Sequence, residues 1–236
     1  MSAAEETAVV SKVIDGDTCQ LEDGRRIRYL GIEAPEEQDR YGEPATQANH
    51  LLVTGKSIRI EFGKPREDRD GRLLAYVFIE KVFVNAELVR QGHAHVRRPV
   101  DVAYRSALMQ AQDEARLAGR GIWDSIGARQ LRIAWVQAKV EGPAKRNLND
   151  EYITIENQGN QPVDLTGWKI LDEAGNPYLV PKFTLEPKRK FTLRTGSGKN
   201  TEQELFWGSR TPIWNDNGDT IFIRDAEGKL VLSHIY

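Results

Sequence analysis

The chain has 236 residues, of which 39% are hydrophobic and 29% are charged, and its formal net charge at pH 7 is −2. This length suits two domains of modest size, and the near-zero charge excludes a protein that coats DNA by charge alone. No stretch approaches the roughly 20 apolar residues of a membrane span. A single cysteine, Cys19, excludes an intrachain disulfide and a multi-cysteine zinc site; we expect it in the core, with no disulfide-linked partner.

The first half of the chain begins with strand patterns. The predicted strands, in chain order, are AVVSKVI, TCQL, RRIRYLGI, SIRIEF and LLAYVFIE. Asp23-Gly24 between the second and third of these runs is a strong hairpin signal. A helix is predicted to open at Pro44, after the third strand, and to end before Gly55.

Two further helices are predicted after the last of these strands. The segment VNAELVRQG predicts a short helix that ends at Gly92. A longer helix follows, with Asp101 as its N-cap and Gly119 just past its end. Five strands with three helices predict a small closed barrel of the oligonucleotide-binding (OB) type, which we place at residues 8–127.

The second half of the chain carries only strand and turn patterns. Its short strand runs, separated by turns with Gly, Asn or Pro, are EYITIEN, PVDLTGWKI, YLVP, KFTLRT, ELFWG, DTIFIRD and KLVLSHIY. So many short strands in a segment of this length predict a β-sandwich. We place this second domain at residues 131–236, joined to the first through residues 125–131. The whole chain is therefore expected to be mainly β.

Acidic residues gather in two short motifs of the first half. In VIDGDT, Asp15 and Asp17 point to the same face of an extended chain, because side chains alternate along a strand. In IEAPEE, Glu33 and Glu36 flank Pro35 at the end of the third predicted strand. Four carboxylates on one face of a barrel repel one another unless a cation or arginines lie among them.

Arg28 and Arg72, on neighbouring predicted strands, can supply that positive charge. The combination suits phosphodiester hydrolysis, because a hard cation held by carboxylates stabilises charge on the phosphoryl oxygens and arginine forks match those oxygens. A nearby carboxylate, here Glu36, can orient and deprotonate the attacking water. Either acidic motif alone fits a charged turn better, so the hypothesis depends on their joint occurrence.

With these motifs in place, residues 8–124 resemble the staphylococcal-nuclease (thermonuclease) family. The segments VIDGDT, RYLGIEAPE, DRDGRLLAYV, VNAELVRQGHAHV and GIW fall in the family's order. The resemblance implies an endonuclease of the micrococcal-nuclease type that hydrolyses DNA and RNA with Ca²⁺. Such an enzyme breaks the 5′ P–O bond and leaves 3′-phosphate ends.

The resemblance also implies roles for individual residues. Asp17 and Glu33 would be calcium ligands together with the backbone carbonyl of Ala34, and Asp15 would be the acidic residue beside them. The catalytic residues, namely the two phosphate-binding arginines and the general base, would be Arg28, Arg72 and Glu36.

Three features depart from the family pattern. Glu33 stands where the family usually has Asp, and the loop after Glu36 is short. The tyrosines that pack on the bound nucleotide in the family's secreted prototype fall at Asp70 and near Arg98, so base stacking is not preserved there. Arg97 and its neighbour Arg98 could hold phosphate instead.

Residues 131–236 resemble the lamin-tail domain, an immunoglobulin-like β-sandwich. The resemblance depends on Gly167-Trp168, Trp214-Asn215 and Gly218-Asp219-Thr220. It implies a domain that binds or positions rather than one that catalyses, and both tryptophans are expected in its core. The basic run 188–190 is expected to be a solvated turn, and His93 and His95 lack further ligands at metal spacing.

Two other functions stay open at this point. The barrel could be a nucleic-acid-binding module that has lost catalysis, or the chain could be a structural or interaction protein centred on the lamin-tail-like domain. The presence of Arg28, Glu36 and Arg72 favours the enzyme. A weak calcium site is typical of extracellular proteins, so we expect a secreted or periplasmic location, although MSAAEETAVV has no signal-peptide pattern.

Overall fold

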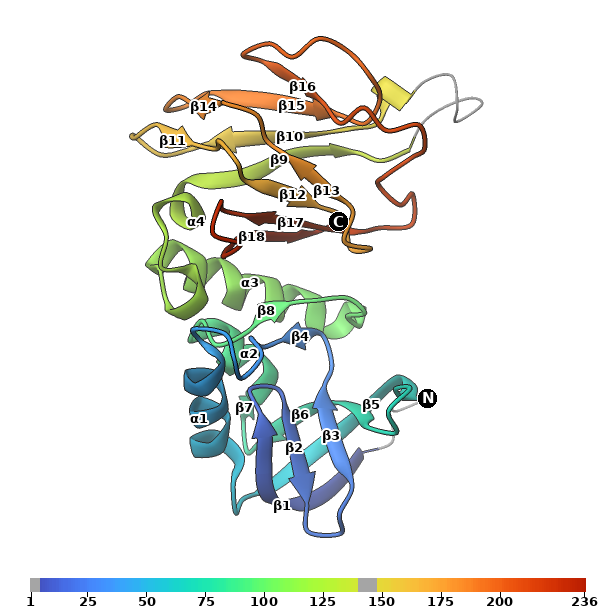
Figure 1. Cartoon of the computed structure of the whole chain (residues 1–236). Helices are drawn as coiled ribbons and strands as arrows, with labels where there is room; N and C mark the ends of the chain where they lie inside the picture. The colour runs from blue at the N-terminus through green and yellow to red at the C-terminus, as the bar shows by residue number, and fades with distance from the viewer. Residues whose placement is uncertain (1–4, 140–147) are drawn as a thin grey trace. The chain divides into compact units, whose positions relative to one another are not determined.

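The computed structural model of the protein describes residues 5–139 and 148–236, which fall into two compact units (Figure 1). The first unit runs to Asp124 and the second begins at Ser125. Among the described residues, no helix has both the length and the apolar character needed to cross a membrane.

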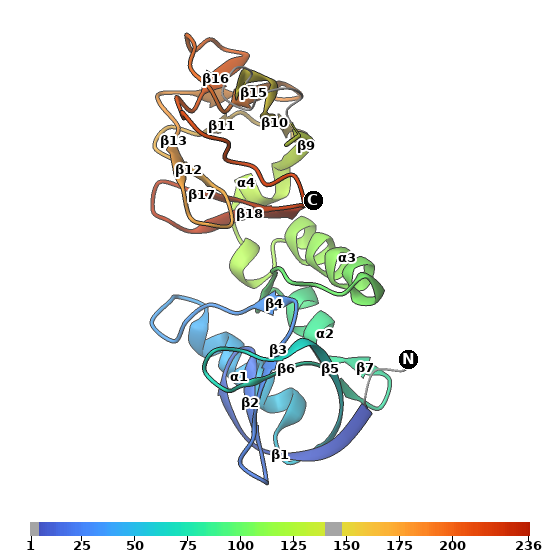
Figure 2. The same cartoon turned by 90° about the vertical axis from the view of Figure 1, so that its right-hand side faces the viewer.

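The first unit is built on one strongly curved sheet. Its strands, in sheet order, are β3 (Arg26–Tyr29), β2 (Thr18–Leu21), β1 (Glu5–Asp15), β5 (Ser57–Glu67), β6 (Leu73–Ile79) and β7 (Val82–Phe83). A parallel pairing of β3 with β6 closes the sheet, so that β1, β2, β3, β5 and β6 form a barrel. Figure 2 shows how far β1 and β5 bend around it. The predicted five-stranded barrel is therefore confirmed.

Irregular pairing explains why the two long strands can bend. The register of β1 against β2 shifts twice, between Val10 and Lys12 and between Val13 and Asp15. The register of β5 against β6 shifts between Phe62 and Glu67, and within this stretch a Cβ added at Gly63 would lie 2.3 Å from Leu30 Cδ2. Bulges of this kind increase the twist and let a sheet close on itself.

Three helices accompany the barrel, as predicted: α1 (Gly42–Val53), α2 (Val84–Arg90) and α3 (Val102–Ala118). The longest, α3, ends at Gly119, whose φ of 64° is the left-handed conformation that favours glycine at this position. Asp101 precedes α3 as predicted, but its side chain makes no capping hydrogen bond. Instead, its backbone N–H donates to the Tyr76 hydroxyl at 2.7 Å. Cys19 is fully buried, as expected.

The unit also has short elements that the sequence did not predict. The strands β4 (Ile32–Glu33) and β8 (His95–Val96) pair antiparallel, β7 pairs with β6, and η1 (Gly121–Trp123) is a single 3-10 turn.

The second unit is a β-sandwich that follows the short helix α4 (Ile126–Gln130). One sheet has the order β16 (Glu204–Phe206), β15 (Lys190–Arg194), β10 (Tyr152–Asn157) and β9 (Leu131–Gln137). The other has the order β13 (Pro177–Leu179), β12 (Lys169–Leu171), β17 (Thr220–Arg224) and β18 (Leu230–Ile235). The remaining elements are η2 (Leu148–Asp150) and the pair β11 (Val163–Asp164) and β14 (Thr184–Leu185).

Apolar residues of both sheets meet between the layers of the sandwich. Ile155 from one sheet and Ile170 and Ile223 from the other line the same interior space. Trp214 is buried as expected, whereas Trp168 is only half-buried, with its ring against the backbone of α4. The basic run 188–190 is exposed, as predicted for a solvated turn. The predicted immunoglobulin-like sandwich is thus confirmed.

One buried carboxylate, Glu151, joins three loops of the sandwich. The residue is 1% exposed, and its Oε1 accepts hydrogen bonds from Thr195 Oγ1 at 2.7 Å, Ile213 N–H at 2.8 Å and Trp214 N–H at 3.2 Å. Burial raises the pKa of this carboxyl, while the three donors oppose the shift.

We predict that Glu151→Ala lowers the free energy of unfolding by roughly 2–4 kcal/mol, because two buried N–H groups lose their acceptor. Glu151→Gln keeps an acceptor oxygen and should cost less. A pKa raised by folding means that the native state binds the proton more tightly, so the wild type should lose stability as pH rises through that pKa, and the Gln variant should not. Thermal unfolding from acidic to neutral pH measures both effects. Equal losses for Ala and Gln would contradict the assignment.

Candidate active site

All the predicted site residues line one pocket of the first unit. The pocket has a volume of about 250 Å³ and is lined by Asp15, Asp17, Arg28, Glu33, Ala34, Pro35, Glu36, Arg72 and Arg97. The barrel therefore brings together the β1–β2 turn, β3, the segment after β4 and the start of β6. Arg97 belongs to the same lining, although no catalytic role was predicted for it.

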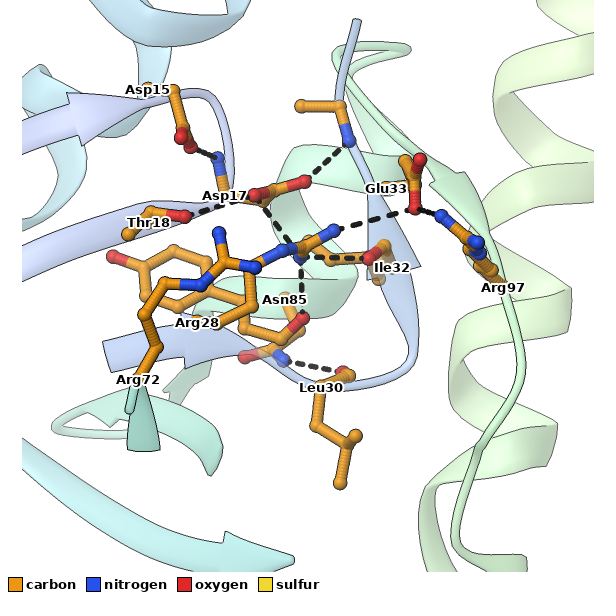
Figure 3. Close-up of polar contacts among 12 residues, drawn as sticks. Asp15, Asp17, Thr18, Arg28, Leu30, Ile32, Glu33, Arg72, Asn85 and Arg97 are labelled. Atoms are coloured by element: carbon orange, nitrogen blue, oxygen red, sulfur yellow. Dashed lines mark hydrogen bonds and ion pairs between the residues drawn. The ribbon is translucent and has the colours of Figure 1, made fainter. Parts of the chain in front are cut away.

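Asp17 is the buried anchor of the pocket (Figure 3). Its side chain is 7% exposed, and its Oδ2 accepts the N–H of Ala34 at 2.6 Å. Its Oδ1 accepts from Thr18 Oγ1 at 3.2 Å and lies 3.0 Å from Arg28 Nη1. Burial raises the pKa of Asp17 to about 7, and the neighbouring Arg28 opposes that shift. A charge on this carboxylate therefore depends on nearby cations.

The turn that carries Asp17 is closed by its own residues. Asp15 Oδ1 accepts the backbone N–H of Asp17 at 2.9 Å. Gly16 packs closely against two alanines: a Cβ added to it would lie 2.5 Å from Ala34 Cβ and 2.7 Å from Ala45 Cβ. The glycine lets the acidic turn lie directly against the segment that follows β4.

Arg28 is fixed by four acceptors. Besides its ion pair with Asp17, its Nη1 donates to the carbonyl oxygens of Tyr29 and Ile32, each at 3.0 Å. Its Nη2 donates to Glu33 Oε2 at 3.4 Å. The side chain is only 16% exposed, so the guanidinium is held in place before any ligand arrives.

Glu33 lies between two arginines. The same Oε2 that accepts from Arg28 also forms an ion pair with Arg97 Nη1 (Figure 3). The pairing of β4 with β8 sets Glu33 opposite His95, and the N–H of Arg97 donates to the carbonyl of Gly31 at 3.0 Å.

Arg72 and Glu36 complete the pocket from its more exposed sides. Arg72 Nε donates to Asp68 Oδ2 at 2.7 Å. Glu36 is exposed, but its backbone is fixed by hydrogen bonds in both directions with Asp39. Gly42 packs so tightly there that a Cβ would lie 1.9 Å from the Glu36 carbonyl oxygen. Glu36 therefore presents an exposed side chain on a fixed backbone.

Two buried asparagines, which the sequence analysis missed, support this framework. Asn85 in α2 accepts the N–H of Val77 at 3.0 Å and donates to the carbonyl of Leu30 at 2.9 Å. Asn49 in α1 donates to the carbonyl of Asp15 at 2.9 Å and accepts from a tyrosine hydroxyl of β3 at 2.9 Å. For Asn85 the available signal was an amide between two apolar residues, in VNAEL; Asn49, between Ala48 and His50, has no such signal.

The donor chemistry of the pocket fits a hard dication such as Ca²⁺, which prefers carboxylate and carbonyl oxygens. Asp17 is a deeply buried carboxylate whose charge a cation would stabilise, and Glu33 and the Ala34 carbonyl belong to the same lining. Within the described ranges, no group of three or more His, Cys, Asp or Glu side chains is arranged to hold a metal ion. Asp17 and Glu33 are instead paired with the arginines.

Each half of the chain matches a known protein family. A family model described as Staphylococcal nuclease homologue matches residues 26–125, and one described as Lamin Tail Domain matches residues 127–236. A thermonuclease of Staphylococcus hyicus is 33% identical over 135 residues, which cover 52% of this chain and 79% of that protein. The chain belongs to the staphylococcal nuclease family.

Other members of the nuclease family show similar agreement. A thermonuclease of Staphylococcus intermedius is 33% identical over 129 residues, covering 50% of this chain and 77% of that protein. An uncharacterized endonuclease of Escherichia coli is 36% identical over 118 residues, covering 48% of this chain and 74% of that protein. These matches concern the nuclease domain, and the lamin tail domain accounts for the rest of the chain.

We predict that Asn85→Ala loosens the segment that carries Arg28 and Glu33, because the Leu30 carbonyl between them loses its buried donor. The free energy of unfolding should fall by roughly 2–4 kcal/mol. Hydrogen exchange measured on peptides covering residues 28–34 should become faster. Asn157→Ala is the matched control, since Asn157 is equally buried and donates to two backbone carbonyls of the sandwich. If both variants left exchange in 28–34 unchanged, Asn85 would not support the site.

Proposed function

We propose that this protein is a calcium-dependent endonuclease that hydrolyses the phosphodiester bonds of DNA and RNA. It would break the 5′ P–O bond and leave 3′-phosphate ends. The observation that carries the proposal is the pocket that combines Arg28, Arg72 and Glu36 with the buried carboxylate of Asp17 and the half-buried carboxylates of Asp15 and Glu33. The similarity to thermonucleases over most of their length supports it.

The two arginines would bind the phosphate. Each is already oriented by a carboxylate, Arg28 by Asp17 and Arg72 by Asp68, so little reorganisation is needed when charge develops on the phosphoryl oxygens. The planar guanidinium forks donate pairs of hydrogen bonds to those oxygens. Their contribution is therefore greatest as the transition state forms.

Glu36 would orient the attacking water and accept its proton. Its exposed carboxylate reaches into the pocket from a fixed backbone, so the side chain can turn toward a water opposite the leaving 5′ oxygen. Ca²⁺, held by Asp17, Glu33 and the Ala34 carbonyl with Asp15 beside them, would supply electrostatic stabilisation of the phosphoryl oxygens.

The lamin tail domain would act as an accessory binding or positioning module. The proposed catalytic residues all belong to the first unit. We also propose a secreted or periplasmic location, because two carboxylates and a carbonyl form a weak calcium site of the kind that works at extracellular calcium concentrations.

Removal of calcium is the first test. Purified protein should cleave plasmid DNA and RNA at millimolar Ca²⁺, lose this activity in excess EDTA and regain it when Ca²⁺ is restored. The products should block primer extension by a polymerase until a phosphatase removes their 3′-phosphates. Intact plasmid and RNA at millimolar Ca²⁺ would contradict the proposal.

Substitution of the base is the second test. Glu36→Gln should lower kcat by roughly 10²–10⁴-fold with little change in KM, because it removes proton transfer and leaves the arginines in place. Glu37→Gln is the matched control: this neighbouring carboxylate is also exposed and does not line the pocket. Full activity of Glu36→Gln would show that another group accepts the proton.

A further inference from the structure

The pocket has a third arginine, Arg97, in addition to the two that the family resemblance assigns to phosphate. Its guanidinium forms an ion pair with Glu33 on the side of the pocket away from Asp15 (Figure 3). The Arg97 side chain is 46% exposed, compared with 16% for Arg28. Arg97 therefore lies at the rim, where a ligand longer than one phosphate would pass.

The backbone holds Arg97 in this place. It directly follows β8, whose Val96 pairs with Ile32, and its own N–H donates to the carbonyl of Gly31 at 3.0 Å. Two consecutive backbone contacts to the segment that carries Glu33 fix the start of the side chain. The guanidinium is thus positioned before a ligand binds, which reduces the entropy cost of using it.

A second pocket adjoins the first on this side. It has a volume of about 180 Å³, and it shares Arg28, Glu33, Arg72 and Arg97 with the first pocket. Its further lining includes Leu74 and the two residues that follow Arg97 in the chain, Arg98 and Pro99. Arg97 therefore lies in the wall common to the proposed reaction site and the space next to it.

Besides its ion pair with Glu33, Arg97 affects the net charge of the first pocket. The first pocket is lined by four carboxylates and three arginines. With a bound dication its net charge would be one positive unit, whereas without Arg97 it would be zero. Arg97 thus contributes the unit of positive charge by which the loaded pocket would attract an anionic polymer.

We propose that Arg97 binds the phosphate next to the scissile one in a polynucleotide, and that Glu33 is its counter-ion until the substrate arrives. The proposal deepens the proposed function and depends on it. It assigns Arg97 to the recognition of a chain of phosphates, so that polynucleotides are preferred over single phosphodiesters.

The test measures binding separately from cleavage. In a Glu36→Gln background with Ca²⁺, fluorescence anisotropy gives the affinity for a labelled single-stranded oligodeoxythymidylate over a range of salt concentrations. Adding Arg97→Gln should weaken binding about 10-fold, the size expected for one charge-assisted contact. The slope of log affinity against log salt should become shallower by about 0.7. Arg97→Lys should keep the slope and recover only part of the affinity, because it keeps the charge without the fork.

A matched control is available in the sandwich. Arg132 forms an ion pair with Glu156, and the two side chains are 48% and 24% exposed, against 46% and 27% for Arg97 and Glu33. Arg132→Gln should leave affinity and salt slope unchanged. If Arg97→Gln also left both unchanged, the proposal would be overturned.

A second experiment compares cleavage of two substrates by the wild type and by Arg97→Gln, both with Glu36 intact. At saturating Ca²⁺, Arg97→Gln should raise KM for the oligonucleotide by a much larger factor than KM for thymidine 5′-(p-nitrophenyl phosphate), a single phosphodiester. Equal losses on both substrates would place Arg97 at the scissile phosphate and overturn the assignment. If the wild type cleaved neither substrate while Arg97→Gln still weakened binding, the proposed hydrolysis would fail and the phosphate contact of Arg97 would be supported.

Discussion

The buried carboxylate of Asp17 is the interaction on which the site depends. It joins the β1–β2 turn to β3 through Arg28 and to the segment after β4 through the N–H of Ala34. One side chain therefore sets the relative positions of three segments, two of which carry the proposed catalytic groups Arg28 and Glu36. Burial raises its pKa to about 7, which shows that the charged form costs free energy in the fold. Burial of the ionised Asp17 carboxylate fixes the geometry of the site, but it lowers the stability of the fold unless cations lie near.

Most of the barrel could be predicted from the sequence because its signals are local. Alternating apolar residues, the Asp23-Gly24 turn and a glycine at the end of α3 each act within a few residues. The closure of the barrel could not be predicted in this way. It depends on the parallel pairing of Ile27 with Leu73 and on bulges in β1 and β5, which follow from packing between segments distant in sequence.

In the site, too, some residues could be predicted from the sequence and others could not. The carboxylates and arginines were predicted because their charges make chemical sense only together. Asn49 and Asn85 were missed because each is neutral and bonds to atoms of segments distant in sequence. The contact between Glu33 and Arg97 was also missed, because it depends on β4 and β8, whose two-residue length is too short to leave a periodic pattern.

Glu33 and Arg97 form an ion pair and are considered together. A glutamate in place of the usual aspartate adds one methylene, and in this structure the carboxylate contacts both Arg28 and Arg97. The Glu33 carboxylate is thus matched by a basic residue that directly follows β8, the strand paired with β4. A net charge of −2 for the whole chain says little about nucleic-acid binding, because some of the acidic residues lie among arginines in the pocket. A bound cation would change the balance at that one place, so attraction for a phosphate chain is a local property of the site and not of the whole surface.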